Sequence, residues 1–113
     1  MNEMEEIERR RAELKSEFGS FYDTVLAILF EADPIEINFG NNTDEYGPEV
    51  DTILPRLREC HSVDDLQKVI HEEFVRWFDA ETAGPLDRYQ PIAQRIWPEV
   101  ERLGLSGVLP NRS

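Results

Sequence analysis

Acidic side chains crowd one stretch of this 113-residue sequence. Residues 31–51 hold seven carboxylates and no Lys or Arg, and so carry seven of the twelve net negative charges of the chain. Carboxylates gathered in this way can ligate a hard cation such as Mg²⁺ or Ca²⁺, or they can attract a basic protein. The seven acids are Glu31, Asp33, Glu36, Asp44, Glu45, Glu49 and Asp51.

The spacing of these acids does not match a helix–loop–helix calcium site. Such a loop needs oxygen ligands at fixed offsets and a glutamate at its twelfth position. When Asn42 takes position one, Asp44 falls at position three, but position twelve is Ile53, which has no ligating atom. An irregular Mg²⁺ or Ca²⁺ site that uses Asp33, Asp44 and Glu45 remains an alternative.

Other side chains with reactive or ligating chemistry are few. Cys60, His61 and His71 are too few for a four-ligand zinc site, and no glycine-rich phosphate loop or strained nucleophile turn is present. A single cysteine also excludes an internal disulfide. We therefore expect no cofactor and no catalytic residues, and we favour a non-catalytic protein over an enzyme.

The favoured interpretation is a protein-interaction module, immunity-like or accessory, whose acidic 33–51 segment faces a basic protein partner. Two alternatives stay open: a metal-dependent enzyme or metal-binding regulator that uses the acidic loop, and a structural homodimer held by the N-terminal helix. The residues expected to contact a partner are Asp33, Glu36, Asp44, Glu45, Tyr46, Glu49 and Asp51.

The overall charge restricts the classes of partner. Twelve Lys and Arg stand against 24 Asp and Glu, which argues against nucleic acid and against anionic membrane surfaces. The longest apolar run, residues 25–30, is too short to span a bilayer, and the acidic N-terminus does not resemble a signal peptide. We expect a cytoplasmic protein.

The spacing of apolar residues predicts the helices that must position these groups. Apolar residues recur at spacings of three and four along residues 4–28, with Arg11 as the one polar residue in the series. This spacing predicts helices over 3–17 and 20–32 with a break at Gly19, or else one long helix. Ser20 is expected to cap the second helix, with Asp23 completing the box. The pattern consists of Met4, Ile7, Arg11, Leu14, Phe18, Phe21, Val25 and Ile28.

Pro34 should hold Asp33 extended and so end the second helix. Three more helical segments are predicted after it. An apolar face predicts a helix from about 46 to 57 that Pro55 interrupts. Another helix follows the Ser62 cap, and a last one, over about 86–103, should be bent or stop near Trp97 because Pro91 and Pro98 lie in it.

The expected architecture is all-α: an irregular bundle of four to five helices with an acidic loop after the second helix. Residues 1–113 form a single domain, with an N-terminal helix over 1–19 and a loose tail over 104–113. Residues 35–42 are expected to be a buried loop rather than a strand. Tyr46, Trp77 and Phe78 lie on apolar faces, so core packing is predicted, with interface anchors as the alternative.

Part of the chain resembles a family of small uncharacterised bacterial all-helical proteins. The resemblance rests on Asp33-Pro34-Ile35-x-Ile37, on Asp44-Glu45-Tyr46-x-Pro48-Glu49-Val50, and on Phe78-x-Ala80-Glu81-Thr82-Ala83-Gly84-Pro85, within residues 21–100. It implies a helical fold and a bacterial cytoplasmic origin. Some members look like immunity or accessory proteins beside toxins, and the resemblance supplies no catalytic residues.

Overall fold

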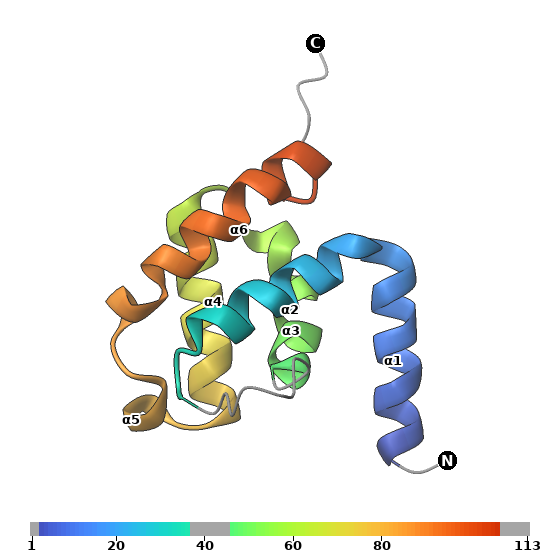
Figure 1. The fold of residues 1–113 in the computed structure, drawn as a ribbon, viewed down its shortest axis with the longest axis horizontal. Coiled ribbons are helices and arrows are strands. Elements are labelled where there is room, and N and C mark those ends of the chain that lie inside the picture. Colours follow the sequence, from blue (N-terminus) through green and yellow to red (C-terminus); the bar gives the residue numbers. More distant parts are fainter. Residues whose placement is uncertain (1–2, 37–45, 107–113) are drawn as a thin grey trace.

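The all-α prediction is confirmed by a computed structural model, which describes residues 3–36 and 46–106. Within these ranges every regular element is a helix (Figure 1). The elements are α1 (Glu3–Phe18), α2 (Ser20–Ala32), α3 (Gly47–Ile53), the 3₁₀ helix η1 (Leu54–Glu59), α4 (Val63–Trp77), α5 (Ala80–Ala83), the 3₁₀ helix η2 (Leu86–Tyr89) and α6 (Gln90–Leu103).

The described residues thus hold six α-helices rather than the four to five expected. The short α5 was not anticipated. The predicted interruption at Pro55 is confirmed, because α3 ends at Ile53 and the chain continues as the 3₁₀ helix η1. Proline has no amide hydrogen to donate to the preceding turn, so the α-helical ladder stops there.

Helix α4 packs against α3, α5 and α6 and against both 3₁₀ helices. Phe74 of α4 is fully buried and gathers an aromatic cluster around it. Its ring centroid lies 5.1 Å from that of Tyr89, 5.8 Å from that of Tyr46 and 6.0 Å from that of Phe78. Aromatic pairs at these separations contribute beyond the area that they bury.

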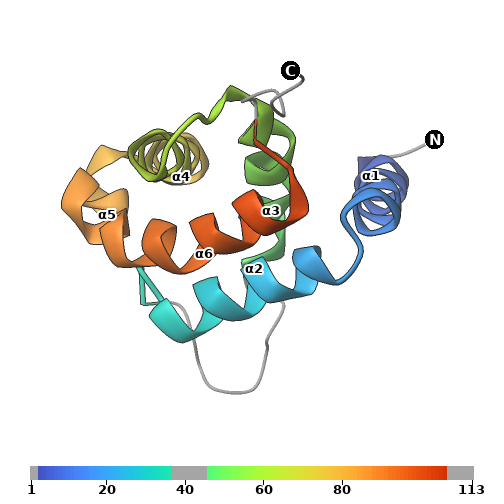
Figure 2. The ribbon, with the colours of Figure 1, turned by 90° about the horizontal axis from the view of Figure 1, so that it is seen from above.

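The predicted break between the first two helices is confirmed at Gly19, which has φ +58°. The Ser20–Asp23 capping box is wrong: Gly19 is the N-cap residue of α2, and no side chain caps it. The break turns α1 away from the rest of the molecule, so that α1 lies at its edge in both views (Figures 1 and 2). Leu14 is buried, whereas Met4 and Ile7 are exposed.

Helix α2 ends at the predicted place but not in the predicted way. Asp33 is left-handed, with φ 46°, rather than extended, and its amide donates to the Leu29 carbonyl. A left-handed C-cap satisfies a carbonyl that the end of the helix would otherwise leave open. Arg88 of η2 then donates to the Pro34 carbonyl at 3.0 Å, which fixes the start of the acidic segment.

Two further expectations and one buried thiol concern the second half of the chain. The Ser62 cap is confirmed, because its hydroxyl accepts from the Asp65 amide at 3.2 Å. Cys60 is fully buried at the end of η1, and burial raises the pKa of its thiol to about 11. Helix α6 does not stop near Trp97 but continues through Pro98 to Leu103. The acidic stretch 37–45 and the tail 107–113 lie outside the described residues.

The connection from α5 to η2 is held by side chains that bind its carbonyl groups. Arg88 donates to Ala83 at 3.1 Å and Tyr89 donates to the same carbonyl at 2.6 Å. The His71 Nε2 atom lies 2.9 Å from the Gly84 carbonyl, which it meets as an N–H donor. None of the helices in the described part of the chain is both long enough and apolar enough to cross a membrane.

Gly84 is the most crowded point of this connection. It has φ +80°, and an added Cβ would lie 2.5 Å from the Arg88 guanidinium carbon. Gly84→Ala should therefore displace Arg88 and break its bonds to the backbone, at a cost of about 1 kcal/mol beyond backbone strain. Urea unfolding measures this against Gly19→Ala, whose positive φ is similar but whose Cβ would meet no atom within 4 Å. Equal destabilisation by both changes would show that the Arg88 contact contributes nothing.

Candidate functional site

Asp51 is a buried anchor between three helices rather than a surface acid. Its side chain is 8% exposed and lies where α3 meets α1 and α2. Its Oδ2 atom accepts from Arg11 Nε at 2.9 Å and from Arg11 Nη2 at 2.7 Å, and its Oδ1 atom accepts from the Tyr22 hydroxyl at 2.6 Å. The charged residue that interrupts the apolar pattern of α1 is therefore the partner of a buried carboxylate.

Tyr46 binds the residues at the start of the acidic 33–51 segment. The side chain is fully buried, as its position on an apolar face predicted, and its hydroxyl donates to Asp33 Oδ1 at 2.6 Å. The Ile35 amide lies 3.5 Å from the same hydroxyl oxygen and donates to it. These bonds bring the two ends of the 33–46 segment together.

Glu49 is a buried carboxyl group in the first turn of α3, with 3% of the residue exposed. Burial raises its pKa to about 7, and the nearby Asp51 charge acts in the same direction. A hydrogen bond from its own backbone amide and the Arg11 charge oppose this rise. Its Oε1 atom has no hydrogen-bond partner among the described residues.

Three of the predicted partner contacts are therefore corrected. Tyr46, Glu49 and Asp51 are buried and cannot form a surface for a partner. Sequence spacing placed Glu49 and Asp51 in one helical turn, but α3 is short and is enclosed by α1, α2 and α4. Of the remaining four residues, Glu36 is exposed and Asp33 is half-buried, whereas Asp44 and Glu45 lie outside the described residues.

A second charged cluster joins η1 to α4 and was missed by the sequence analysis. Glu73 is 1% exposed, and its Oε2 atom accepts from Arg56 at 2.9 Å and from Arg76 at 3.3 Å. Arg56 also donates to Glu59 and Glu72. These hydrogen bonds, and the one to Glu59 most strongly, raise the pKa of the Arg56 guanidinium. Glu73 falls on the apolar face of α4, three residues after Ile70. A charged residue on an apolar face could have indicated a buried ion pair.

The prediction that Trp77 packs in the core is wrong. It is the last residue of α4 and is 46% exposed, and its indole nitrogen donates to Thr52 Oγ1 at 2.9 Å. Phe78, the next residue, is 37% exposed. Both rings therefore remain partly open to solvent.

An apolar hollow of about 280 Å³ lies between α1 and the Trp77 ring, and we call it the Trp77 groove. Ile7 of α1 forms one wall, and Trp77 with Pro48 forms the other. Ile7 is 46% exposed and Met4, one turn earlier on α1, is 62% exposed. The groove is lined by Ile7, Arg10, Arg11, Pro48, Asp51, Thr52 and Trp77.

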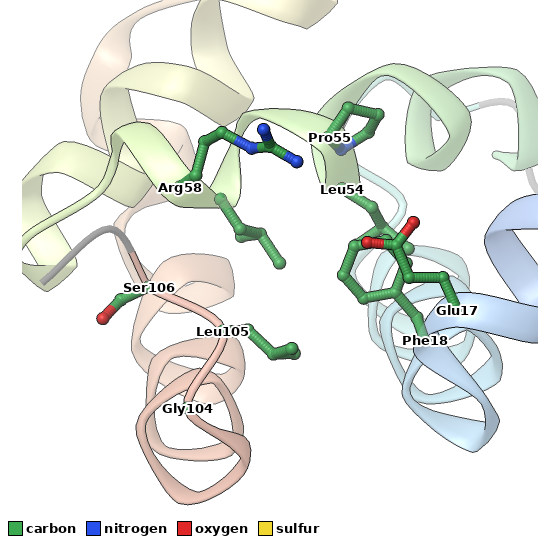
Figure 3. Close-up of a pocket in the computed structure, with 9 residues that line it drawn as sticks. Glu17, Phe18, Leu54, Pro55, Arg58, Gly104, Leu105 and Ser106 are labelled. Atoms are coloured by element: carbon green, nitrogen blue, oxygen red, sulfur yellow. The ribbon is translucent and has the colours of Figure 1, made fainter. Parts of the chain in front are cut away.

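A larger hollow of about 450 Å³ lies between the α1–α2 junction, η1 and the end of α6. Figure 3 shows Phe18, Leu54 and Leu105 around it, with Glu17 on one side and Arg58 on another. Its lining mixes one carboxylate, one guanidinium and apolar side chains from the end of α1, from η1 and from the segment after α6. The two unpaired buried oxygens of the described residues belong to Glu49 and Glu73, and neither lies in this lining.

The described residues place no three His, Cys, Asp or Glu side chains where they could share a metal ion. Two of the three carboxylates of the predicted cation site, Asp44 and Glu45, lie outside the described ranges, so that alternative stays a prediction. Comparisons of the chain with family models, with curated proteins and with solved structures find no match. The predicted family resemblance therefore also stays a prediction.

The buried Glu49 carboxyl predicts a pH-dependent stability. Its folded pKa of about 7 is above the ordinary value of 4.5, so the folded state holds a proton that the unfolded state releases. Wild-type stability should therefore fall as the pH rises from 4.5 through 7. Glu49→Gln should raise the free energy of unfolding at pH 8 by on the order of 1 to 2 kcal/mol and leave it nearly unchanged at pH 4.

Chemical denaturation at the two pH values measures this difference. Glu36→Gln is the matched control, because Glu36 is exposed and the same change there should have little effect at either pH. A Glu49→Gln variant that is no more stable than wild type at pH 8 would contradict the prediction.

Proposed function

We propose that the protein is a non-catalytic interaction module that binds another protein chain through the Trp77 groove. One observation carries this proposal: Ile7 and Trp77 expose large apolar side chains on opposite walls of a single apolar hollow, and Met4 is exposed one turn before Ile7. Aromatic residues such as Trp are enriched among the anchors of protein interfaces, where they fill pockets and exclude water. Neighbouring exposed apolar side chains on a small acidic domain are otherwise unfavourable in water.

The walls of the groove support this role. Trp77 is held by its bond to Thr52, and Arg11 is held by Asp51, so both sides of the groove are fixed before a partner arrives. A site whose groups are already in place loses less conformational entropy on binding. The surface of the groove is almost entirely apolar, although Asp51 and Arg10 are among the residues that line it.

Site-specific photo-crosslinking in cells tests the proposal. A photoreactive residue at position 7 should give a protein adduct that is identified by mass spectrometry and disappears with Trp77→Ser. The same residue at position 87 is the control, because Asp87 is exposed on η2 and is not among the residues that line the groove. An equal yield at both positions, or an adduct that survives Trp77→Ser, would overturn the proposal.

The acidic segment is the second candidate surface for a partner of this module. Glu36 is exposed, and the chain carries twice as many acids as bases, which favours a basic protein. Binding there should weaken steeply with salt, and by roughly tenfold in a Glu36→Ala/Asp44→Ala/Glu45→Ala variant. Titration calorimetry at two salt concentrations measures this with a basic protein that the tagged wild-type chain captures at low salt, and Ile7→Asp should leave such binding unchanged. Salt-insensitive binding would exclude the acidic segment.

A further inference from the structure

We propose that the occupant of the Trp77 groove is the N-terminal half of α1 from a second copy of this chain, packed antiparallel. This inference rests on the proposed function, because it names the partner of the same surface. It requires that the exposed part of α1 be complementary to itself in both shape and charge. The apolar side chains, the charge order along α1 and the burial of Leu14 in its C-terminal half each support this requirement.

The exposed apolar residues of α1 form a short self-complementary patch. Met4 and Ile7 are three residues apart and so lie on the same face of the helix. When two such helices run in opposite directions, Met4 of one copy meets Ile7 of the other, and the reverse contact follows by symmetry. Both side chains are then covered without any change in the fold of either copy.

The order of charges along α1 favours the antiparallel direction. Residues 3–8 hold four glutamates and no base, whereas residues 9–15 hold three arginines, one lysine and one glutamate. Antiparallel packing places the acidic end of one helix against the basic end of the other. Glu3 and Arg10 occupy equivalent flanking positions beside the apolar pair, so Glu3 of each copy meets Arg10 of the other.

Parallel packing produces the opposite result. The flanking positions then bring Glu3 against Glu8 and Arg10 against Lys15, and both pairs repel. Longer antiparallel overlaps are also excluded, because they would need Leu14, which is buried within its own copy. The short antiparallel register is therefore the one that uses only exposed apolar residues and pairs opposite charges.

This register also fills the groove. Ile7 is a wall of the Trp77 groove, so the Met4 side chain that reaches Ile7 from the second copy enters beside the indole ring. Methionine sulfur makes favourable contacts with aromatic rings and adapts to irregular cavities. The interface is small, and we expect a dissociation constant in the micromolar range.

Sedimentation velocity of the purified full chain, from about 1 µM to about 500 µM, tests the proposal. The wild type should shift from monomer to dimer across this range, and Ile7→Asp should remain monomeric. Glu3→Arg and Arg10→Glu should each weaken the dimer by about tenfold, because each creates two repulsive pairs. The double variant Glu3→Arg/Arg10→Glu should restore the wild-type constant, since the pairs are then reversed but complementary.

Two controls make the outcomes decisive. Lys68→Glu makes the same charge change as Arg10→Glu at an exposed position on α4 and should leave the constant unchanged. Circular dichroism shows that each variant keeps its helices. A monomer at every concentration, a dimer that survives Ile7→Asp, or a double variant that stays weak would each overturn the inference. An adduct at position 7 with a different protein would do the same, yet it would leave the proposed interaction module intact.

Discussion

The position of α1 depends on one buried interaction, the Arg11–Asp51 ion pair with its Tyr22 hydrogen bond. The last two turns of α1 add apolar contacts, where Leu14 is buried and Phe18 is half-buried, and the Lys15 ammonium lies over the Tyr22 ring. Apolar contacts resist separation but do not fix direction, whereas the two bonds from Arg11 to one carboxylate oxygen do. Removing one member of such a pair costs about 3–5 kcal/mol, because the other stays buried without compensation.

The Trp77 groove follows from this arrangement. One wall comes from α1 and the other from α3 and the end of α4, and Asp51 of α3 binds Arg11 of α1 between them. Gly19 allows the turn between α1 and α2, and the ion pair decides how far the N-terminal half of α1 stands from the body. The exposed apolar surface of the Trp77 groove therefore depends on the Arg11–Asp51 ion pair, which holds α1 in place.

Local rules predicted the helices better than the burial of individual side chains. Gly19, Pro55 and Ser62 each impose a constraint that acts within a few residues, and the structure has a break, a change of helix type and a cap at these positions. Trp77 and Phe78 also continue an apolar pattern, but whether they are covered depends on how far α3 and α1 extend, which no local pattern encodes. The same limit explains Glu49 and Asp51: a sequence window counts charges, whereas their exposure depends on which helices surround α3. Among the acids of the 33–51 segment that the structure describes, Glu36 alone is exposed, as a partner-binding surface would require.

The buried thiol of Cys60 has a consequence for how the motions of this protein can be followed. Thiol reagents attack the thiolate, and a pKa of about 11 together with complete burial leaves almost none of it accessible in the folded state. Modification of Cys60 therefore requires that η1 first separate from the core. Since the chain has no other cysteine, the rate of alkylation reports how often this region opens.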